Sequence, residues 1–300
     1  MKLYKFNTFT TSYYFPAVDT DTEFLYDLYS AYGKKISRIY WALFRQSRYI
    51  RFLTRVDSGS VDFPYNEICR LTGANRFLSF CMGSPGPYQK ISILGYNEVD
   101  RIRFFAKYSL KPQAMRLTKN EINVYKNMQG SRLTPCLYDS VVEDDFVFLK
   151  TEYVKGHRPS SYKFNNNALS LCFELKNYHL SEKRYSDEGL LLCLSHGDFC
   201  PWNMLVDEGT THLIDWEQAA DRPLGFDLFT YIAQVTNLIT PNILLDTAIK
   251  EHSYYICKYF DSFNISDWVP YLKAFAAETK NFKIKKGSPE IAARYDCLLK

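Results

Sequence analysis

The stretch LSHGDFCPWNMLVDEGTTHLIDWE, residues 194–217, is the most informative part of this 300-residue sequence. It contains His196, Asp198 two positions later, and Asn203 after four intervening residues. Two short apolar runs follow, separated by an Asp-Glu-Gly turn, and the second run ends at Asp215. This pattern predicts a β-hairpin that brings Asn203 and Asp215 to the same place.

The chemistry of these side chains explains their spacing. A carboxylate such as Asp198 can accept the proton of an attacking hydroxyl group. The amide of Asn203 and the carboxylate of Asp215 offer the hard oxygen ligands that hold Mg²⁺ on nucleotide phosphates. The spacing is that of phosphoryl-transfer catalytic loops, with Gly197 where protein kinases carry an arginine. Asp198 is therefore the candidate base, and Asn203 and Asp215 are the candidate metal ligands.

From His196 to Leu228 the sequence resembles the aminoglycoside phosphotransferase and choline kinase group of small-molecule kinases. The shared features are HGD followed by the asparagine, the short hairpin, IDWE, and PLGFDL at residues 223–228. The resemblance implies an α+β, bilobal protein kinase-like fold that binds ATP, or another NTP, with Mg²⁺ between its lobes. It also implies transfer of the γ-phosphoryl group to a hydroxyl group of a small molecule.

The resemblance and the local periodicity together divide the chain into three parts. Residues 1–75 are expected to form an N-terminal helical extension. Residues 76–155 are expected to form an N-lobe with an antiparallel five-stranded sheet and one helix, which Pro112 begins. Residues 156–300 are expected to form a mainly helical C-lobe with the catalytic loop, the metal site and the acceptor pocket.

Lys107 and Glu121 are the candidates for an ion pair near the nucleotide. Arg103, Phe105 and Lys107 share one face of the expected third strand. Glu121 lies on an otherwise apolar helical stripe, where a carboxylate needs a partner. The resemblance then orients Lys107 toward the α- and β-phosphates. The alternative is a capping box of Thr118 and Glu121, if the helix begins at Thr118.

Two further segments are expected to contact the nucleotide. The turn MGSPGPYQK offers Gly83 and Gly86 near the phosphates, although its prolines have no N–H group to donate. The segment FLKTEYVKG resembles the hinge of the family. The backbone from Glu152 to Val154 is therefore expected to contact the base.

Three residues near the catalytic loop receive supporting roles. His196 is expected to pack inside the loop, because the aspartate carries the proton chemistry. Asp227 either complements the dipole of a helix that begins nearby or, as the resemblance implies, braces the backbone of the loop. Glu217 is expected to face either the metal site or the substrate.

The region after Thr240 is where the resemblance places the acceptor pocket. It contains nine Lys and Arg and seven Asp and Glu. A net positive wall argues against polycationic aminoglycosides. Rings at helical spacing favour a core, and a cage or a wall for a sugar is the alternative; they are Tyr254, Tyr255, Tyr259, Phe260, Trp268, Tyr271 and Phe275. The expected acceptor is a sugar, a polyol or an amino alcohol.

Composition and charge exclude other classes of protein. Apolar residues make up 46% of the chain and charged residues 23%, which excludes disordered, collagen-like and coiled-coil proteins. A net charge of +4 does not suggest nucleic acid as a partner. The eight cysteines lack metal-ligand spacing, and no apolar run is long enough to span a bilayer. We therefore expect a cytoplasmic protein without a transmembrane segment.

The expected second helix of the extension is strongly basic. It carries seven basic residues and no acid; they are Lys34, Lys35, Arg38, Arg45, Arg48, Arg51 and Arg55. A solvated face explains such a pattern, and the alternative is a site for a phosphate-bearing partner or a membrane surface. This leaves a second functional hypothesis, a nucleotide-binding pseudokinase or scaffold that docks a protein partner through this helix.

Overall fold

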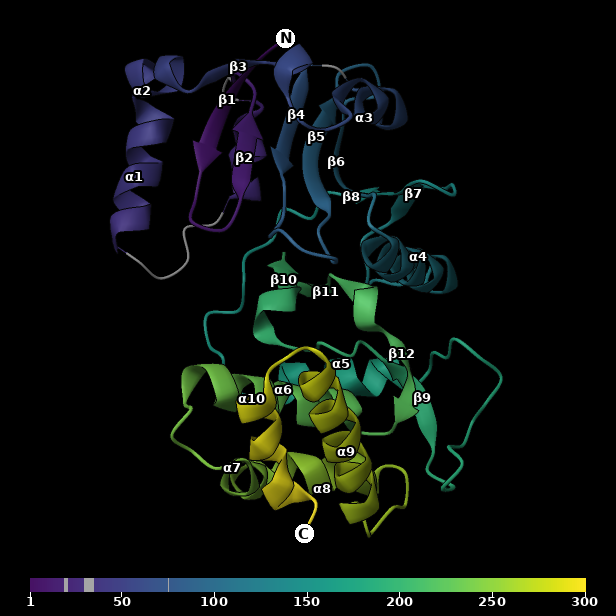
Figure 1. Ribbon diagram of the computed structural model, residues 1–300. Helices are drawn as coiled ribbons and strands as arrows, with labels where there is room; N and C mark the ends of the chain where they lie inside the picture. The colour runs from purple at the N-terminus through teal and green to yellow at the C-terminus, as the bar shows by residue number, and fades with distance from the viewer. Residues whose placement is uncertain (19–20, 30–34, 75) are drawn as a thin grey trace. The chain divides into compact units, whose positions relative to one another are not determined.

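A computed structural model describes residues 1–18, 21–29, 35–74 and 76–300 of the protein. The chain divides into two compact units (Figure 1). The N-terminal unit comprises residues 1–123 and 135–153, and the C-terminal unit comprises residues 124–134 and 154–300.

The N-terminal unit is built on one antiparallel sheet of eight strands. The strand order is β3-β1-β2-β4-β5-β6-β8-β7. The strands are β1 (Lys2–Asn7), β2 (Ser12–Phe15), β3 (Arg55–Asp57), β4 (Phe77–Cys81), β5 (Ile91–Asn97), β6 (Ile102–Ser109), β7 (Leu137–Val142) and β8 (Val147–Glu152). Strands β4 to β8 lie where the sequence predicted a five-stranded sheet.

Strands β1, β2 and β3 correct the prediction that residues 1–75 form a helical extension. Strand β2 pairs with β4 through Tyr13 and Tyr14, so the predicted five strands become part of a sheet of eight. Tyr and Phe favour strands because their rings pack well on a pleated surface, and β1 and β2 are rich in both. The prediction rested on the apolar stripes after residue 20 and assigned no structure to these short runs.

The helical part of this segment is more broken than predicted. The unit's helices are two 3₁₀ helices (Glu23–Leu28 and Ser58–Ser60), α1 (Lys35–Gln46), α2 (Arg48–Leu53), α3 (Tyr65–Thr72) and α4 (Pro112–Asn127), which continues into the C-terminal unit. Lys34, which the sequence analysis placed in the basic helix, lies outside the described residues. Phe44 of α1 is buried against Phe6 and Phe15, with ring centroids 5.0 and 5.9 Å away. Part of the aromatic content is therefore core.

The C-terminal unit is mainly helical, as predicted. Its elements are α5 (Asn166–Leu175), α6 (Phe226–Ile239), α7 (Leu245–Glu251), α8 (Ser253–Asp261), α9 (Val269–Lys285), α10 (Pro289–Ala293), β9 (Leu192–Ser195), β10 (Met204–Asp207), β11 (Thr210–Leu213) and β12 (Ala220–Pro223). Strands β10 and β11 form the predicted hairpin, and β9 pairs with β12. The second pair was not predicted because no short turn joins its strands: the catalytic loop and the β10–β11 hairpin separate them along the chain. Helix α6 is apolar and largely buried, so it anchors the unit.

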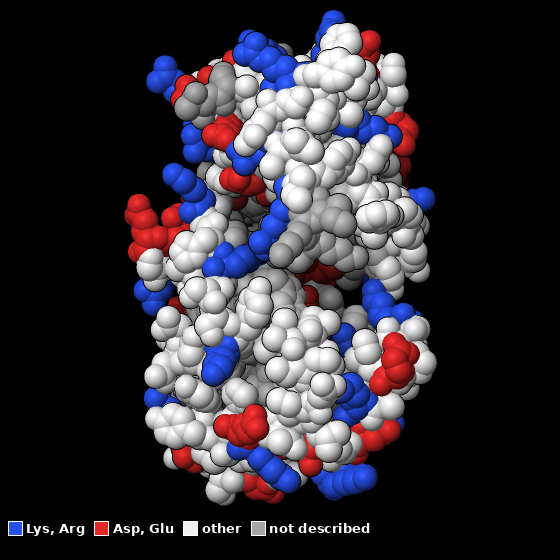
Figure 2. Space-filling view, turned by 90° about the vertical axis from the view of Figure 1, so that its left-hand side faces the viewer, with Lys and Arg blue, Asp and Glu red and all other residues white. Residues whose placement is uncertain are grey.

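The surface carries charges of both signs. On the face that Figure 2 shows, Lys and Arg side chains are interspersed with Asp and Glu and with uncharged residues. An extended field of one sign, which nucleic-acid-binding proteins use, is not seen among the described residues of this face. In the described parts of the chain, no helix combines the length and apolar content needed to cross a membrane.

Candidate active site

The catalytic loop follows β9 and is held in place by Asp227 of α6. One carboxylate oxygen of Asp227 accepts hydrogen bonds from the Ser195 hydroxyl at 2.8 Å and from the Gly197 N–H at 3.1 Å. The other accepts the His196 N–H at 2.7 Å. Burial raises the pKa of Asp227, and its contacts with His196, Ser195 and Gly197 oppose that shift. The side chain thus fixes three consecutive residues of the loop, as bracing requires.

His196 ties this loop to the hairpin. Its side chain is fully buried, and its Nε2 lies 3.0 Å from the backbone oxygen of Ile214. Its Nδ1 accepts the backbone N–H of Asp198 at 3.3 Å. The ring lies 4.5 Å from that of Trp216. The structure therefore gives His196 the packing position expected from the sequence.

Asp198 has both carboxylate oxygens oriented by amide groups. Its Oδ2 accepts a hydrogen bond from Asn203 Nδ2 at 2.9 Å. Its Oδ1 accepts a hydrogen bond from Gln234 Nε2 of α6 at 3.4 Å. These two contacts hold the carboxylate in one orientation at the end of the loop, as the positioning of a general base requires.

The hairpin brings Asn203 and Asp215 together, as the sequence predicted. Met204 pairs with Leu213, and the Ile214 N–H donates to the Asn203 backbone oxygen at 3.0 Å. Asp215 follows with a φ of 70°, which is uncommon for a residue with a side chain. Such backbone strain often marks functional sites.

The donor atoms at this place fit Mg²⁺ bound to a nucleotide. Asn203 Nδ2 donates to the backbone oxygen of Asp198 at 2.9 Å as well as to its carboxylate, so the amide oxygen is left to bind a cation. With Asp215 it makes a pair of hard oxygen donors, and phosphate oxygens and water complete such sites. Among the described residues, no group of three or more His, Cys, Asp or Glu forms a metal site by itself.

Lys107 and Glu121 form the predicted ion pair in the N-terminal unit. Lys107 Nζ lies 2.9 and 2.7 Å from the two carboxylate oxygens, and the residues are 4% and 1% exposed. The capping-box alternative is wrong, because α4 begins at Pro112 and places Thr118 inside the helix. The Thr118 hydroxyl instead lies 2.8 Å from that of Ser109.

The other predicted residues are placed as follows. Gly83 and Gly86 lie in the loop between β4 and β5. Glu152 ends β8, and its backbone N–H donates to the Cys136 oxygen at 2.8 Å. Val154 is the first residue of the C-terminal unit after the sheet. Glu217 is partly buried in the short 3₁₀ helix that follows Asp215.

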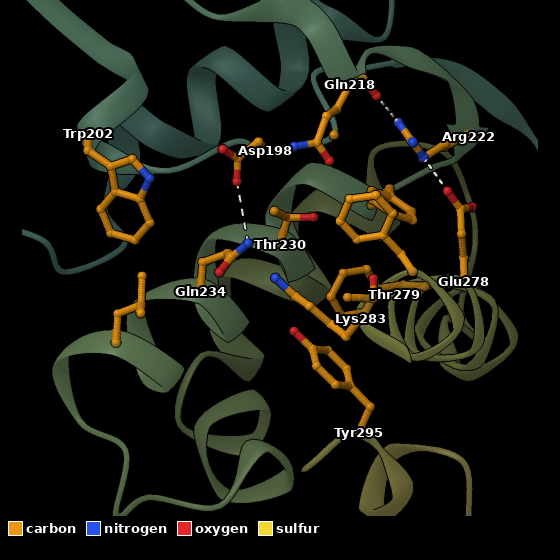
Figure 3. A pocket seen from close by; sticks show the side chains of 15 residues that line it. Asp198, Trp202, Gln218, Arg222, Thr230, Gln234, Glu278, Thr279, Lys283 and Tyr295 are labelled. Carbon is orange, nitrogen blue, oxygen red and sulfur yellow. Dashed lines mark hydrogen bonds and ion pairs between the residues drawn. The ribbon is translucent and has the colours of Figure 1, made fainter. Parts of the chain in front are cut away.

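A cavity of about 320 Å³ opens beside Asp198 within the C-terminal unit (Figure 3). The catalytic loop, α6 and α9 supply most of its lining. Sequence analysis missed Thr230 and Gln234, which lie one helical turn apart and face the cavity from α6. Two polar residues at this spacing in a largely apolar helix were the signal that could have revealed them.

Most of the seven rings weighed as an acceptor wall do not line this cavity. Only Phe275 of that set does so. Tyr259, Phe260, Tyr271 and Phe275 are buried, so the core that the helical spacing favoured holds for most of the set, while Tyr254 is exposed. The other rings of the cavity lie outside that set; they are Trp202, Phe226, Phe282 and Tyr295.

Comparison with known proteins agrees with this geometry. Residues 118–254 match the phosphotransferase enzyme family. The apo form of a thermostable mutant of aminoglycoside phosphotransferase APH(4)-Ia has the same fold, with 10% identity, coverage of 79% of this chain and 98% of that one, and a TM-score of 0.50. The family match and this fold confirm the resemblance seen in the sequence, the kinase-like fold and the prediction of a phosphotransferase.

Two further solved structures match with lower TM-scores, and no curated protein matches the chain. The thermostable mutant in ternary complex with ADP and hygromycin B is 9% identical, covers 78% of this chain and 97% of that one, and has a TM-score of 0.49. Amicoumacin kinase hAmiN in complex with AMP-PNP, Ca²⁺ and Ami is 10% identical, covers 69% and 84%, and has a TM-score of 0.45.

Proposed function

We propose that this protein is an Mg²⁺-dependent phosphotransferase that moves the γ-phosphoryl group of ATP, or of another NTP, to a hydroxyl group of a small molecule. The observation that carries the proposal is the Asp198 carboxylate, which is held by Asn203 and Gln234 at the edge of a cavity. A cavity of about 320 Å³ suits a small acceptor. The finer proposal for this acceptor is a sugar, a polyol or an amino alcohol.

Asp198 accepts the proton of the acceptor in this proposal. The acceptor oxygen forms a bond to the γ-phosphorus while the bond from that phosphorus to the β,γ-bridging oxygen breaks. The proton passes to Asp198, and the nucleoside diphosphate leaves with the electron pair of the broken bond. Positioning supplies most of the rate enhancement in such a transfer, because little covalent chemistry falls to the protein.

The residues proposed to hold the nucleotide are assigned one by one. Asn203 and Asp215 bind the Mg²⁺ that neutralises charge on the phosphates. Lys107, oriented by Glu121, binds the α- and β-phosphates. The proposed remaining contacts are the turn of Gly83 and Gly86 and the backbone from Glu152 to Val154, with His196, Asp227 and Glu217 in supporting positions.

The test combines nucleotide binding with turnover. The purified chain is incubated with Mg²⁺, ATP and a panel of alcohols, and release of ADP is measured. We expect Mg-ATP to raise the melting temperature and Asp198→Asn to lower turnover by roughly a hundredfold or more. Asp187→Asn is the control, because its side chain is 90% exposed. If no alcohol is phosphorylated and Mg-ATP leaves the melting temperature unchanged, the proposal is wrong.

A cytoplasmic location belongs to the same proposal. All eight cysteines are free thiols in the structure. Free thiols in this number suit a reducing compartment, where ATP is also plentiful. Acid-quenched alkylation of the protein in cells, followed by mass spectrometry, measures how many thiols are reduced there.

A second candidate function is a nucleotide-binding scaffold that docks a protein partner through its basic helix. The observation in its favour is that Ile39, Leu43 and Phe52 of α1 and α2 are exposed beside Arg38 and Arg48. A scaffold binds Mg-ATP without consuming it. The turnover assay therefore separates the two candidates, provided that the panel contains the acceptor proposed next.

A further inference from the structure

Most of the charged side chains that line the cavity already have partners within the protein. Arg222 Nε lies 2.6 Å from a carboxylate oxygen of Glu278, and its Nη1 donates to the Gln218 backbone oxygen at 2.9 Å. The Asp198 carboxylate is held by two amides and serves as the proposed base. Figure 3 shows these contacts on opposite sides of the same space. Neither carboxylate is therefore available for a cationic acceptor.

Lys283 is the cationic side chain of the lining that takes no part in these contacts. It lies near the end of α9, and its ammonium group points into the cavity toward Thr230 and Gln234 (Figure 3). Among the residues that the structure describes, none offers it a hydrogen bond or an ion pair. The side chain is partly buried, with Phe275 and Phe282 in the same lining. An ammonium group that reaches inward rather than into solvent needs an anion.

The favourable effect of a lysine on the dipole of a helix end does not account for this orientation. Lys283 and Lys285 both lie in the last turn of α9, and Lys286 caps it. Lys285 and Lys286 are exposed, so they can serve the dipole from the solvent side. That interaction requires proximity to the last carbonyl groups and does not require a side chain to enter a cavity.

Tyr295 adds a second donor on the same side of the cavity. It is 1% exposed, and its hydroxyl oxygen accepts a hydrogen bond from Asn237 Nδ2 at 3.3 Å. Burial raises the pKa of Tyr295 to about 12, so its hydroxyl keeps its proton at neutral pH. The proton remains available to an acceptor in the cavity, which Figure 3 shows the hydroxyl facing.

We propose that the acceptor is an alcohol that also carries an anionic oxygen group, a carboxylate or a phosphate, which Lys283 binds while the hydroxyl group lies at Asp198. The inference rests on the proposed function and narrows its substrate class. It disfavours amino alcohols, whose cationic group Lys283 repels. Lysine binds carboxylates and phosphates alike as a point charge. The inference therefore specifies an anionic oxygen group, which both kinds of acceptor carry.

Matched sets of alcohols test the sign of the charge. One set is glycerol, glycerate and glycerol 3-phosphate, and another is glucose, gluconate and glucose 6-phosphate. Choline and ethanolamine form the cationic arm. We expect the best acceptor to be an anion, with kcat/KM roughly tenfold to a hundredfold above its neutral parent, because a hydrogen bond to a charged group contributes about 1.5–3 kcal/mol. The carboxylate and phosphate members of each set distinguish the two sources of charge.

Lys283→Met tests the residue. It keeps the length and helix propensity of the side chain while removing the charge. We expect it to abolish the preference for the anion, mainly through KM. Lys285→Met, an exposed neighbour on the same turn, is the matched control and should keep the preference.

A binding measurement separates this inference from the proposed function. Each alcohol is titrated into the full chain carrying Asp198→Asn, without nucleotide, by calorimetry. Tighter binding of an anion that Lys283→Met abolishes supports the inference, even if the wild-type chain transfers no phosphoryl group. If no anion binds more tightly than its neutral parent, whether or not that parent binds, the inference is wrong. An undiminished preference in Lys283→Met overturns it as well.

Discussion

Cys200 shows how the charges of the candidate site act on one residue. Its Sγ lies 3.1 Å from the Asp198 backbone oxygen, and its side chain is buried. Burial raises the pKa of the Cys200 thiol strongly, and the negative charges of Asp198 and Asp215 raise it further. A raised pKa keeps the thiol protonated at neutral pH, whereas the thiolate is the nucleophile. Cys200 is therefore a packing residue, and the reactivity of its thiol depends on the charges of Asp198 and Asp215.

This shift predicts which cysteines react with iodoacetamide. In the native protein at pH 7–9 we expect no alkylation of Cys200, while Cys257, which is exposed, reacts. Because the folded pKa lies above the unfolded one, the stability that the protonated thiol contributes is present below about pH 8.5 and is lost as the pH rises beyond it. Mass spectrometry of digested protein measures the labelling, and urea-unfolded protein should label at every cysteine. Rapid native labelling of Cys200 at pH 8 would contradict this account.

The Lys107–Glu121 pair is a second feature at the scale of single residues. Glu121→Gln removes the carboxylate that lies 2.7 and 2.9 Å from the buried Lys107 ammonium group. We expect a loss of about 3–5 kcal/mol in the free energy of unfolding, because removing one partner of a buried ion pair is strongly destabilising. Urea denaturation measures it.

A double substitution separates charge from packing at the same place. Lys107→Met with Glu121→Leu removes both charges, and replacing a buried pair by apolar residues is often neutral or stabilising. We expect this protein to regain most of the lost stability but not the binding of Mg-ATP. Equal losses in the single and the double variants would show that the ion pair is not the cause.

At the scale of elements, the catalytic loop depends on a glycine. Gly197 has a φ of 79°, and a Cβ atom there would lie 2.3 Å from the Gln218 backbone oxygen. Gly209 in the hairpin turn has a φ of 82° with open space around it. Gly209→Ala should lower the free energy of unfolding by about 1–2 kcal/mol, because of the backbone conformation alone. We expect Gly197→Ala to lower it by about 1–3 kcal/mol more, because of the clash, and to lower turnover sharply. Thermal unfolding and ADP release compare the two variants, and equal effects would count against the clash.

The elements also show what the sequence could predict. The β10–β11 hairpin was predictable because turn residues separate two apolar runs. Glu121 was predictable because it breaks an apolar helical stripe, and Lys107 because the family resemblance implies a lysine on the third strand. Strands β1 and β2 were missed because short aromatic runs fit either a strand or a loop until β4 pairs with β2, and β2 with β1. Lys283 was missed because lysines are mostly exposed and a cation near a helix C-terminus is already explained by the helix dipole. Its direction depends on how α9 packs on α6, which local sequence does not encode.

At the scale of the N-terminal unit as a whole, the first 75 residues are part of the core. Leu3 and Tyr14 share a buried cluster with Phe80 and Phe104. Ile68 of α3 is fully buried in the same cluster. Burial of such side chains contributes about 1.5–3 kcal/mol each. The boundary predicted at residue 75 therefore cuts through one hydrophobic core.

Removal of residues 1–75 tests this integration. The truncated chain loses the β2 partner of β4 and exposes that edge, which favours aggregation. We expect it to lack a cooperative unfolding transition and to elute as aggregate in size-exclusion chromatography. Phe52→Ser in the full chain is the control, because that side chain is 64% exposed and should leave stability within about 0.5 kcal/mol. A truncated chain that unfolds cooperatively and still binds Mg-ATP would mean that the eight-stranded sheet is a five-stranded unit with an addition, as the sequence first indicated.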